Sequence, residues 1–496
     1  MTNAWRISYG EIPNRDIFEI IPPFSFLSTA FLFKIFGQSI FIGRLLSLIL
    51  AFALIFLLNI VIKKVAVDFS LRFLSISLLI PFGVSYWPLP SHHWWCDIFC
   101  LLSVCFLFPS FETILTGGNL PQAPPERRGE KNFLPFQRRI QEGFPLVLSG
   151  LFCGLAVWTL QDQGGYLFIL LTSFLLFNLV KQKDVSKLKP QKAIAFFIFG
   201  FILATIPFLL WLLPTAGVSK LFQDLVLFPL ASYHNLEGHK FDIFSGWNQF
   251  FPILSKGAFL SAPIYTLSLT IIAIFLFVLP IISIFSFIYA KLTKSDGEKF
   301  FLIIALFIAG FLTALHRWSF TNIVWALPLL LPSLSFLFEG KLRKSAKIVS
   351  YFLGITALLF SVSFFRLSSP ERMESICGRA GCVRTFKSNY SVSVKNAVSF
   401  LEINSKEGET LFCAGFNSLI NFLTQMKNPT PFNEFVSYHT DKQFEELKRA
   451  IIEKRVDWVL IPKDKTLSNE KIEKFVLENY NKVYENNFCK IYKIKN

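Results

Sequence analysis

The sequence has 496 residues, of which 53% are hydrophobic, 60 are Phe and only 17% are charged. Soluble domains average about 25% charged residues, so one water-soluble core cannot accommodate this much apolar surface. The formal net charge is +16, but Lys and Arg are scattered among short loops between apolar blocks. This distribution fits a cytoplasmic membrane face rather than a nucleic-acid-binding surface, so we expect membrane lipids as partners and no nucleic acid.

The first 40 residues form a polar segment that runs into an apolar stretch. Asp16 and Glu19 stand three positions apart, and on a helical turn their carboxylates would share one face. Such a pair at a membrane surface would suit a divalent cation or a general base, although a solvated loop with an Arg15 ion pair explains the same residues. The following stretch 23–37 carries Lys34 and is too short to span a bilayer, so we expect a helix that lies in the interface or re-enters the membrane.

Apolar blocks of about 17 to 25 residues follow, which is the length that a helix needs to cross a bilayer. A membrane β-barrel would instead need alternating segments of about ten residues, whereas 41–62 is apolar on all sides. The sequence therefore predicts an all-α polytopic membrane protein with about ten transmembrane helices. The expected spans are 41–62, 71–88, 94–111, 144–160, 165–180, 193–214, 264–290, 299–315, 321–338 and 345–365.

Basic residues in alternate loops indicate the orientation of these spans. One set of loops holds 20 Lys and Arg in 72 residues, at 63–72, 112–143, 181–192, 291–299 and 339–347. The other set holds 7 in 104 residues, at 1–40, 88–93, 161–165, 215–262 and 316–320. We therefore expect the first set in the cytoplasm, and both termini with the segment 366–496 on the far side.

Polar residues recur where spans end on that far side, and they could converge on one cavity. Each alone is better explained as a solvated loop residue or a helix cap. Asp97 and Arg44 differ, because they lie slightly inside spans, where an ionisable group is costly and usually paired or functional. For Asp97 a functional role and a structural ion pair remain open. The other candidates are His92, His93, Gln161, Asp162, Gln163, His234, His239, His316 and Arg317.

From residue 366 onward the pattern changes to short strands and amphipathic helices. Apolar residues at helical spacing mark 394–404 and 441–455, while 410–415, 457–462 and 489–494 are typical of buried or edge strands. We expect three regions: an extracytoplasmic loop with an interfacial helix at 1–40, a transmembrane domain at 41–365, and a small α/β extracytoplasmic domain at 366–496. Cys377 and Cys382 form a local disulfide there or remain two free thiols.

The segment from Gly10 to Pro23, GEIPNRDIFEIIPP, and the segment from Gly43 to Ser47, GRLLS, resemble the first extracytoplasmic loop and following span of the GT-C membrane glycosyltransferases. This group, of the family 39 type, includes protein O-mannosyltransferases and lipid A aminoarabinose transferases. Its loop typically reads G-x-x-P-Y-R-D-F-F-E-x-x-P-P, followed by A-R-L-x-S. The segments 150–171 and 314–334 are similar to later spans of the same group.

The resemblance implies that a sugar moves from a polyprenyl-phosphate-linked donor to a lipid, glycan or protein acceptor, with inversion at the anomeric carbon. It implies a bacterial inner membrane enzyme with a possible divalent metal. Catalytic roles fall to Asp16, Glu19 and Asp97, donor-phosphate binding to Arg15, Arg44 and Arg317, and metal binding to Glu19 and His234. His92, His93, Gln161, Asp162 and His316 are expected to line the same cavity.

The family normally has a further span before this loop, followed by an acidic residue that is the favoured base. Here the sequence begins after that point, so we expect either a start upstream of Met1 or a truncated, non-catalytic relative. A transporter or flippase of lipid-linked saccharides is the third interpretation. A transporter should show repeat-related halves with paired broken helices, and the sequence has no such internal similarity.

Overall fold

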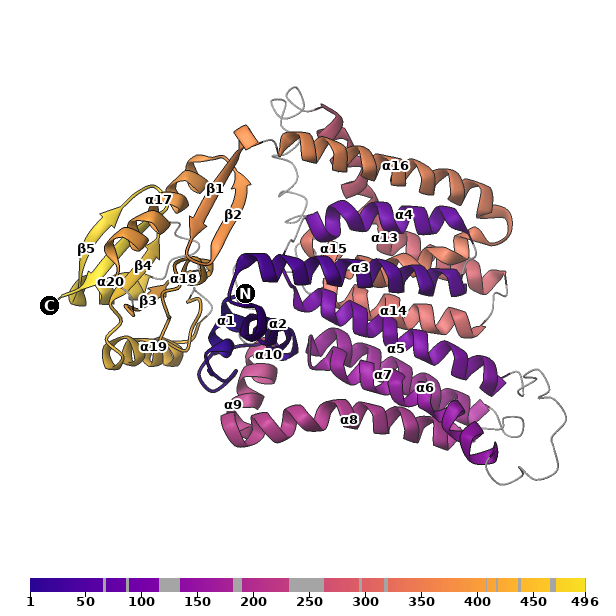
Figure 1. Cartoon of the computed structure of the whole chain (residues 1–496). Coiled ribbons are helices and arrows are strands. Elements are labelled where there is room, and N and C mark those ends of the chain that lie inside the picture. Colours follow the sequence, from indigo (N-terminus) through magenta and orange to yellow (C-terminus); the bar gives the residue numbers. More distant parts are fainter. Residues whose placement is uncertain are drawn as a thin grey trace. The chain divides into compact units, whose positions relative to one another are not determined.

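The computed structural model describes residues 1–65, 68–85, 89–115, 134–181, 190–231, 263–293, 297–315, 320–368, 370–406, 408–415, 418–435, 439–463 and 470–495. The chain divides into two compact units. Unit 1 comprises Met1–Ser47, Leu212–Lys240 and Phe364–Asn496, and unit 2 comprises Leu48–Trp211 and Phe241–Ser363. Figure 1 labels their helices and strands.

Each predicted span overlaps a helix in the described part of the chain, which confirms the polytopic helical architecture. Of these spans, only 71–88 has its end outside the described residues. The helices are α3 (Ile40–Val65), α4 (Phe69–Leu79) with the π-helical turn η1 (Ile80–Ser85), α5 (His92–Leu115), α6 (Leu134–Val157), α7 (Gln161–Lys181), α8 (Pro190–Ala216), α13 (Pro263–Leu292), α14 (Gly297–Leu315), α15 (Phe320–Leu330) with the 3₁₀ turns η5 (Leu331–Phe338), and α16 (Arg343–Leu367).

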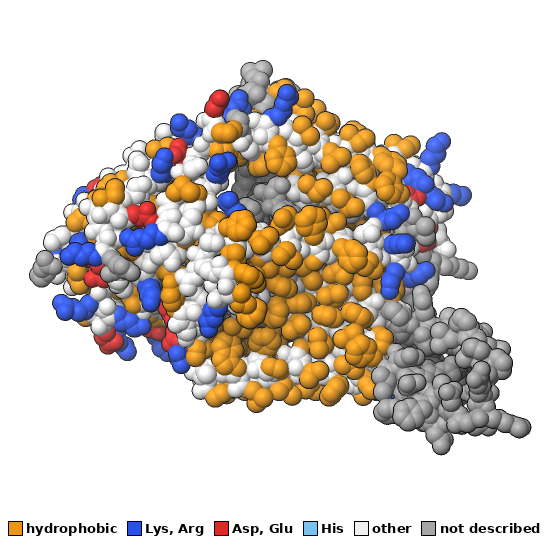
Figure 2. Space-filling view, in the orientation of Figure 1, with side chains coloured by type: hydrophobic (Ala, Val, Ile, Leu, Met, Phe, Trp, Pro, Cys, Tyr) orange, Lys and Arg blue, Asp and Glu red, His pale blue; other side chains and the backbone are white. Residues whose placement is uncertain are grey.

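Among the described residues, five helices are long and apolar enough to cross a membrane by length and composition. These are Ile40–Val65, Gln191–Ala216, Pro263–Leu292, Thr321–Phe338 and Gly340–Leu367. Figure 2 shows hydrophobic side chains spread over a broad area of the visible face. Phe56 on α3, Ile281 on α13 and Phe352 on α16 are all more than half exposed. Water-soluble proteins rarely expose such an area, so these helices face lipid and the chain is an integral membrane protein.

Helices α6 and α8 pack through small residues. A Cβ atom added to Gly150 would lie 1.8 Å from the carbonyl oxygen of Phe197, and one added to Gly200 would lie 1.9 Å from that of Val147. One turn further along α6, a Cβ on Gly154 would lie 2.8 Å from the Ala204 Cβ. Small residues four apart on both helices thus let the two backbones touch, as is typical of membrane helices that associate by close packing.

Unit 1 contains a four-stranded sheet in the order β3-β4-β6-β5. β3 pairs in parallel with β4, and the remaining neighbours are antiparallel. The predicted strands and helices of the C-terminal region are confirmed, while α18, α20, β5 and the β1–β2 hairpin were not predicted. The elements are β1 (Met373–Gly378), β2 (Gly381–Phe386), α17 (Asn389–Asn404), β3 (Leu411–Cys413), α18 (Leu419–Thr424), α19 (Asp441–Glu453), β4 (Trp458–Pro462), α20 (Glu470–Asn479), β5 (Tyr480–Glu485) and β6 (Cys489–Ile494).

Alternate residues of the central strands face two separate cores, as the two-residue period of a strand requires. Leu411 and Leu460 belong to the core that contains α17 residues, whereas Phe412 and Val459 belong to the core that contains α19 and α20 residues. The sheet is therefore covered by apolar side chains on both faces. Short elements complete the description: α1 (Thr2–Ser8), α2 (Phe24–Phe36), α9 (Val218–Phe222), η2 (Gln223–Leu227), α10 (Phe228–Ala231), η6 (Gly340–Leu342) and η7 (Pro370–Arg372).

The N-terminal segment is part of the first of these cores. Trp5 of α1 is 1% exposed, and its ring centroid lies 6.0 Å from that of Phe422 in α18. Phe33 of α2 stacks on the same Phe422 ring at 5.6 Å. α2 is the helix predicted at 23–37, and its Phe33 face packs into the core of the C-terminal region. Residues 1–40 and 366–496 thus belong to one folded unit.

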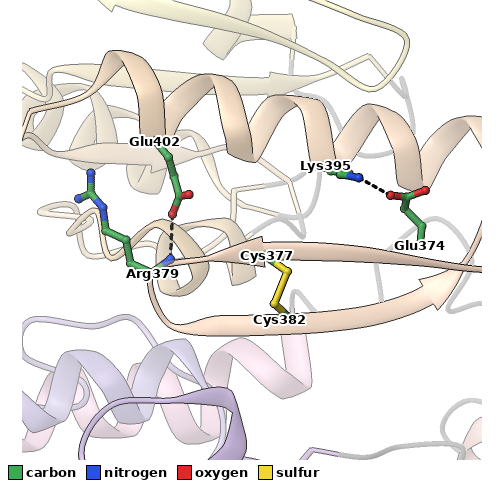
Figure 3. Close-up of a disulfide and its surroundings, with 6 residues drawn as sticks. All are labelled: Glu374, Cys377, Arg379, Cys382, Lys395 and Glu402. Atoms are coloured by element: carbon green, nitrogen blue, oxygen red, sulfur yellow. Dashed lines mark hydrogen bonds and ion pairs between the residues drawn. A yellow bond between two sulfur atoms is a disulfide. The ribbon is translucent and has the colours of Figure 1, made fainter. Parts of the chain in front are cut away.

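A disulfide joins Cys377 and Cys382 across the β1–β2 hairpin, where the two residues pair in register (Figure 3). Helix α17 contacts β1 near both of the strand's ends: Lys395 Nζ lies 2.7 Å from Glu374 Oε1, and the Arg379 N–H donates to Glu402 Oε1 at 2.8 Å. At the hairpin tip, the Ala380 carbonyl accepts a hydrogen bond of 3.1 Å from the Ile40 N–H at the start of α3.

The glycine contact between α6 and α8 predicts the effect of a single methyl group. Gly200→Ala should lower the thermal unfolding temperature of the protein in detergent, because the new Cβ forces the helices apart at a cost of about 1–3 kcal/mol. Gly165→Ala on α7 is the matched control, since its Cβ would meet nothing within 4 Å. Equal unfolding temperatures for Gly200→Ala and the wild type would contradict the close packing.

Candidate functional site

Glu19 lies between α1 and α2, just after a turn in which Pro13 and Ile17 form an isolated bridge. Its carboxylate is held by donors from two directions. Oε1 accepts from the backbone N–H groups of Ile20 at 2.9 Å and Ile21 at 3.1 Å, and Oε2 accepts from Asn3 Nδ2. The half-buried carboxylate is therefore fixed in one orientation before any ligand binds.

Burial raises the pKa of Glu19 to about 7. The nearby Glu434 carboxylate raises it further, while the N–H donors of Ile20, Ile21 and Asn3 oppose the shift. A carboxyl group that titrates near neutral pH can both accept and release a proton under physiological conditions, which is the requirement for a general base.

Asn14 anchors the backbone of Glu19 from the opposite side. It is fully buried and adopts φ of 60°, a left-handed conformation that Asn tolerates better than most residues. Its Nδ2 donates to the Glu19 carbonyl at 2.7 Å and to Asp224 Oδ2 at 3.3 Å. Both partners can only accept here, which fixes the orientation of the amide. Its Oδ1 has no hydrogen-bond partner within the described ranges.

Asp224 belongs to η2 and is 2% exposed. Burial raises its pKa to about 6, although Lys220, whose Nζ lies 3.9 Å from Oδ2, and Asn14 both oppose the shift. Asp224 is not among the site residues predicted from the sequence. A single acid in the apolar stretch LFQDLVLF was the available signal, because Asp is rarely buried without a reason.

Asp16 and Arg15 pair with each other. Arg15 Nη2 lies 2.7 Å from Asp16 Oδ2, and the Ile12 N–H donates to the same oxygen at 2.8 Å. Burial would raise the pKa of Asp16, but these donors outweigh it and lower the pKa. Residues 14–16 form a non-helical turn, so Asp16 and Glu19 do not share one face of a helix as the sequence suggested. The two carboxylates have different hydrogen-bond partners. Asp16 thus has the environment of a solvated ion pair.

Asp97 of α5 is 2% exposed and accepts a hydrogen bond of 2.6 Å from Gln163 Nε2 of α7. Its described contact is therefore an amide rather than an ion pair. Asp162 accepts from the Gln163 N–H at 2.8 Å in the first turn of α7, which begins at Gln161. A negative side chain is favourable there because it faces the positive end of the helix dipole.

His92 and His93 lie at the start of α5 with ring centroids 4.3 Å apart. His93 stacks on Trp325 of α15 at 4.0 Å, and its buried Nδ1 has no hydrogen-bond partner in the part of unit 2 that is described. These residues, Asp97 and Gln163 belong to unit 2, whereas Glu19 belongs to unit 1. Their convergence on one cavity stays a prediction.

Arg44 lies on α3 within unit 1, and its half-buried side chain has an Nε atom without a hydrogen-bond partner among the described residues. A buried guanidinium donor of this kind is well suited to an anionic ligand, because an unsatisfied buried donor is costly. The remaining candidates His234, His239, His316 and Arg317 lie outside the described residues.

The predicted ligands of a divalent metal are Glu19 and His234. Across the described ranges, no three His, Cys, Asp or Glu side chains come together as metal ligands would. Both Glu19 carboxylate oxygens already accept N–H groups, and His234 is outside the described residues. The divalent metal and its ligands Glu19 and His234 therefore stay a prediction.

No protein-family model matches the sequence, and a comparison with curated proteins finds no match. Solved structures do match. ArnT from Cupriavidus metallidurans bound to undecaprenyl phosphate aligns with 99% of this chain and 92% of its own, with a TM-score of 0.55 and 10% identity. The apo state of the same protein gives a TM-score of 0.54 at 10% identity, covering 99% and 91% of the two chains.

An oligosaccharyltransferase from Archaeoglobus fulgidus, tethered to an acceptor peptide with an NVT sequon, matches with a TM-score of 0.50 and 12% identity. The alignment covers 100% of this chain and 69% of that one. The fold of this protein is thus that of these GT-C membrane glycosyltransferases, and the expected resemblance is confirmed at the level of the fold.

The raised pKa of Glu19 predicts how stability depends on pH. A carboxyl whose pKa rises from 4.5 to about 7 on folding stabilises the fold below pH 4.5, and this contribution is lost as the pH rises through about 7. Glu19→Gln should therefore gain stability relative to wild type between pH 5 and pH 8, by about 1–2 kcal/mol after allowance for partial exposure. Thermal unfolding at both pH values measures this gain.

The control is Glu374→Gln. The hydrogen bond from Lys395 lowers the pKa of Glu374, so its contribution to stability is lost only as the pH falls below about 4.5. Its difference from wild type should be the same at pH 5 and pH 8. A Glu19→Gln variant that behaved like this control would show that Glu19 does not titrate near neutral pH.

Proposed function

We propose that this protein is a membrane glycosyltransferase that moves a sugar from a polyprenyl-phosphate donor to a lipid, glycan or protein acceptor outside the cytoplasm. The observation that carries the proposal is the match along 99% of the chain to ArnT, whose structure contains undecaprenyl phosphate. Because a fold alone does not determine a function, the chemistry must come from particular residues. Glu19 and Arg44 supply it.

Glu19 suits the role of general base. In the proposed reaction the acceptor hydroxyl oxygen attacks the anomeric carbon and its proton passes to the Glu19 carboxylate. The bond between the anomeric carbon and the phosphate oxygen breaks, and the polyprenyl phosphate leaves with the bonding electron pair. A pKa near 7 keeps a large fraction of Glu19 ionised at neutral pH, while leaving it basic enough to accept the proton.

Arg44 suits the phosphate of the donor and of the leaving group. Its Nε atom has no described partner, and guanidinium groups bind phosphate oxygens through charge-assisted hydrogen bonds. Arg15 is a weaker candidate because its charge already pairs with Asp16. The charge that develops on the leaving phosphate would thus be stabilised by a donor with no competing carboxylate described.

The location follows from the same proposal. The loops rich in Lys and Arg would lie in the cytoplasm of a bacterial cell, and unit 1 would face outward from the inner membrane. Asp97 of unit 2 is proposed as a second functional carboxylate, supported by its burial and its single described amide partner.

Transfer and binding can be separated by two variants of the full chain in nanodiscs. Glu19→Gln should reduce the release of undecaprenyl phosphate from undecaprenyl-phosphate-linked sugars by about 100-fold or more, because the base is lost. It should bind undecaprenyl phosphate with wild-type affinity. Arg44→Ala should instead weaken that binding about tenfold or more, since a charge-assisted hydrogen bond is lost.

Arg72→Ala is the matched control for Arg44→Ala. Arg72 also has a buried Nε atom without a described partner, but it belongs to the predicted cytoplasmic set of residues. A wild-type chain that binds undecaprenyl phosphate without cleaving the donor would identify a non-catalytic relative. Movement of the intact donor between leaflets, without cleavage, would identify a transporter.

The orientation predicts which surface residues react from outside the cell. Ile403→Cys places a thiol at a side chain that is 81% exposed at the end of α17, and a membrane-impermeant maleimide should label it in intact cells. Lys344→Cys, at the exposed start of α16, should react only after the membrane is opened. The reverse labelling pattern would contradict the proposed topology.

A further inference from the structure

We propose that Asn433 of the C-terminal α/β region is a positioning residue that fixes the Glu19 carboxylate through the side chain of Asn3. This inference rests on the proposed function, because it assigns to the C-terminal region a part in the same reaction. It goes beyond that function by naming the hydrogen bonds through which a region of the chain more than 400 residues away orients the base.

The segment that carries Asn433 is preformed. Asn428 donates to the Phe432 carbonyl at 2.7 Å, and its Oδ1 accepts from the Thr430 N–H at 3.0 Å. Thr430 and Asn428 are almost fully buried. The segment has no regular secondary structure, so these side-chain bonds replace the backbone bonds that a helix or strand would provide. A rigid segment can hold another residue in place.

The same segment binds the N-terminal region at two points, Arg6 and Phe18. Arg6 donates to the Thr430 carbonyl at 2.8 Å and to Asn433 Oδ1 at 2.9 Å. The Phe18 N–H donates to the Pro431 carbonyl at 2.8 Å. Since Phe18 immediately precedes Glu19, the backbone at the base is tied directly to the C-terminal region.

The side-chain bonds form a chain with one direction. Arg6 can only donate, so the oxygen of Asn433 must face Arg6 and its Nδ2 must face Asn3. Asn433 Nδ2 donates to Asn3 Oδ1, which leaves Asn3 Nδ2 to donate to Glu19 Oε2. The guanidinium thus determines the orientation of both amides, and the last of them presents an N–H to the carboxylate.

The charged groups around Glu19 explain why this donor matters. Glu434, the neighbour of Asn433, is a second carboxylate close enough to disfavour ionised Glu19. Asn3 donates the side-chain hydrogen bond to the half-buried Glu19 carboxylate, beside the two backbone donors of Ile20 and Ile21. Without Asn433, the Asn3 amide is free to turn, and Glu19 Oε2 loses its side-chain donor while Oε1 keeps the two backbone donors.

Two variants of Asn433 test the proposal in the full chain in nanodiscs. Asn433→Ala removes both bonds. Asn433→Asp keeps the acceptor for Arg6 but cannot donate to Asn3. Both should lower kcat for release of undecaprenyl phosphate about 10- to 100-fold, while KM for the donor changes less than about threefold, because misorienting a catalytic group affects the reaction step. Asn479→Ala is the control, since the described contact of the Asn479 side chain is a hydrogen bond to the Phe475 carbonyl of its own helix.

A second readout does not depend on transfer. Ile20 and Ile21 donate their backbone N–H groups to Glu19, so hydrogen–deuterium exchange in the peptide 17–23 reports the fixed carboxylate. Asn433→Ala and Asn433→Asp should speed this exchange about tenfold, as Glu19→Ala should, and should add nothing in the Glu19→Ala background. Asn479→Ala should leave it unchanged.

The outcomes are distinguishable. A wild-type chain without transfer activity would overturn the proposed function. Faster exchange in both Asn433 variants of that chain would still support the contact from Asn433 to Glu19. Wild-type kcat in Asn433→Asp would overturn the proposal, as would unchanged exchange in Asn433→Ala alongside faster exchange in Glu19→Ala. Loss of kcat with an equal loss in Asn479→Ala would also overturn it, because the effect would then be a general loss of stability.

Discussion

The packing of Trp5 and Phe33 on Phe422 is the interaction on which the rest of unit 1 depends. It makes the first 40 residues part of the core of the C-terminal region instead of a separate loop. Two aromatic side chains buried in this way stabilise the fold by on the order of several kcal/mol, far more than each hydrogen bond around them contributes. The aromatic packing therefore holds the N-terminal segment and the C-terminal region together. The hydrogen bonds at Glu19 need only select one arrangement of the side chains.

The network then works because its hydrogen bonds are complementary. Arg6 is 3% exposed and meets Glu11 in an ion pair as well as the carbonyl groups of the C-terminal region. Such a buried charge is costly unless each of its donors is satisfied. Here it is matched by acceptors from both chain segments, so it selects one arrangement of the loop among the many that the hydrophobic contacts alone would allow.

Local sequence patterns predicted the spans, the helix within 23–37 and three of the four strands of the larger sheet, because hydrophobic periodicity and span length are local properties. Glu19 came from its position in a motif. Asn14, Asp224 and Asn433 were missed, since each acts through a partner far away in sequence and none has a local signature beyond a turn-forming Asn or an isolated acid. Long-range hydrogen bonds of this kind become visible only once the fold is known.

The hydrogen bond between Thr2 and the Ser418 carbonyl joins residues 416 positions apart. During synthesis, at about 5–20 residues per second, the N-terminal segment must wait roughly 20–80 s for its partner strand and helix to emerge. Trp5 and Phe33 remain uncovered throughout that interval, and every membrane span is inserted before they find Phe422. The candidate site around Glu19 is consequently assembled last, so a prematurely terminated chain would carry the membrane helices without the hydrogen bonds that position this carboxylate.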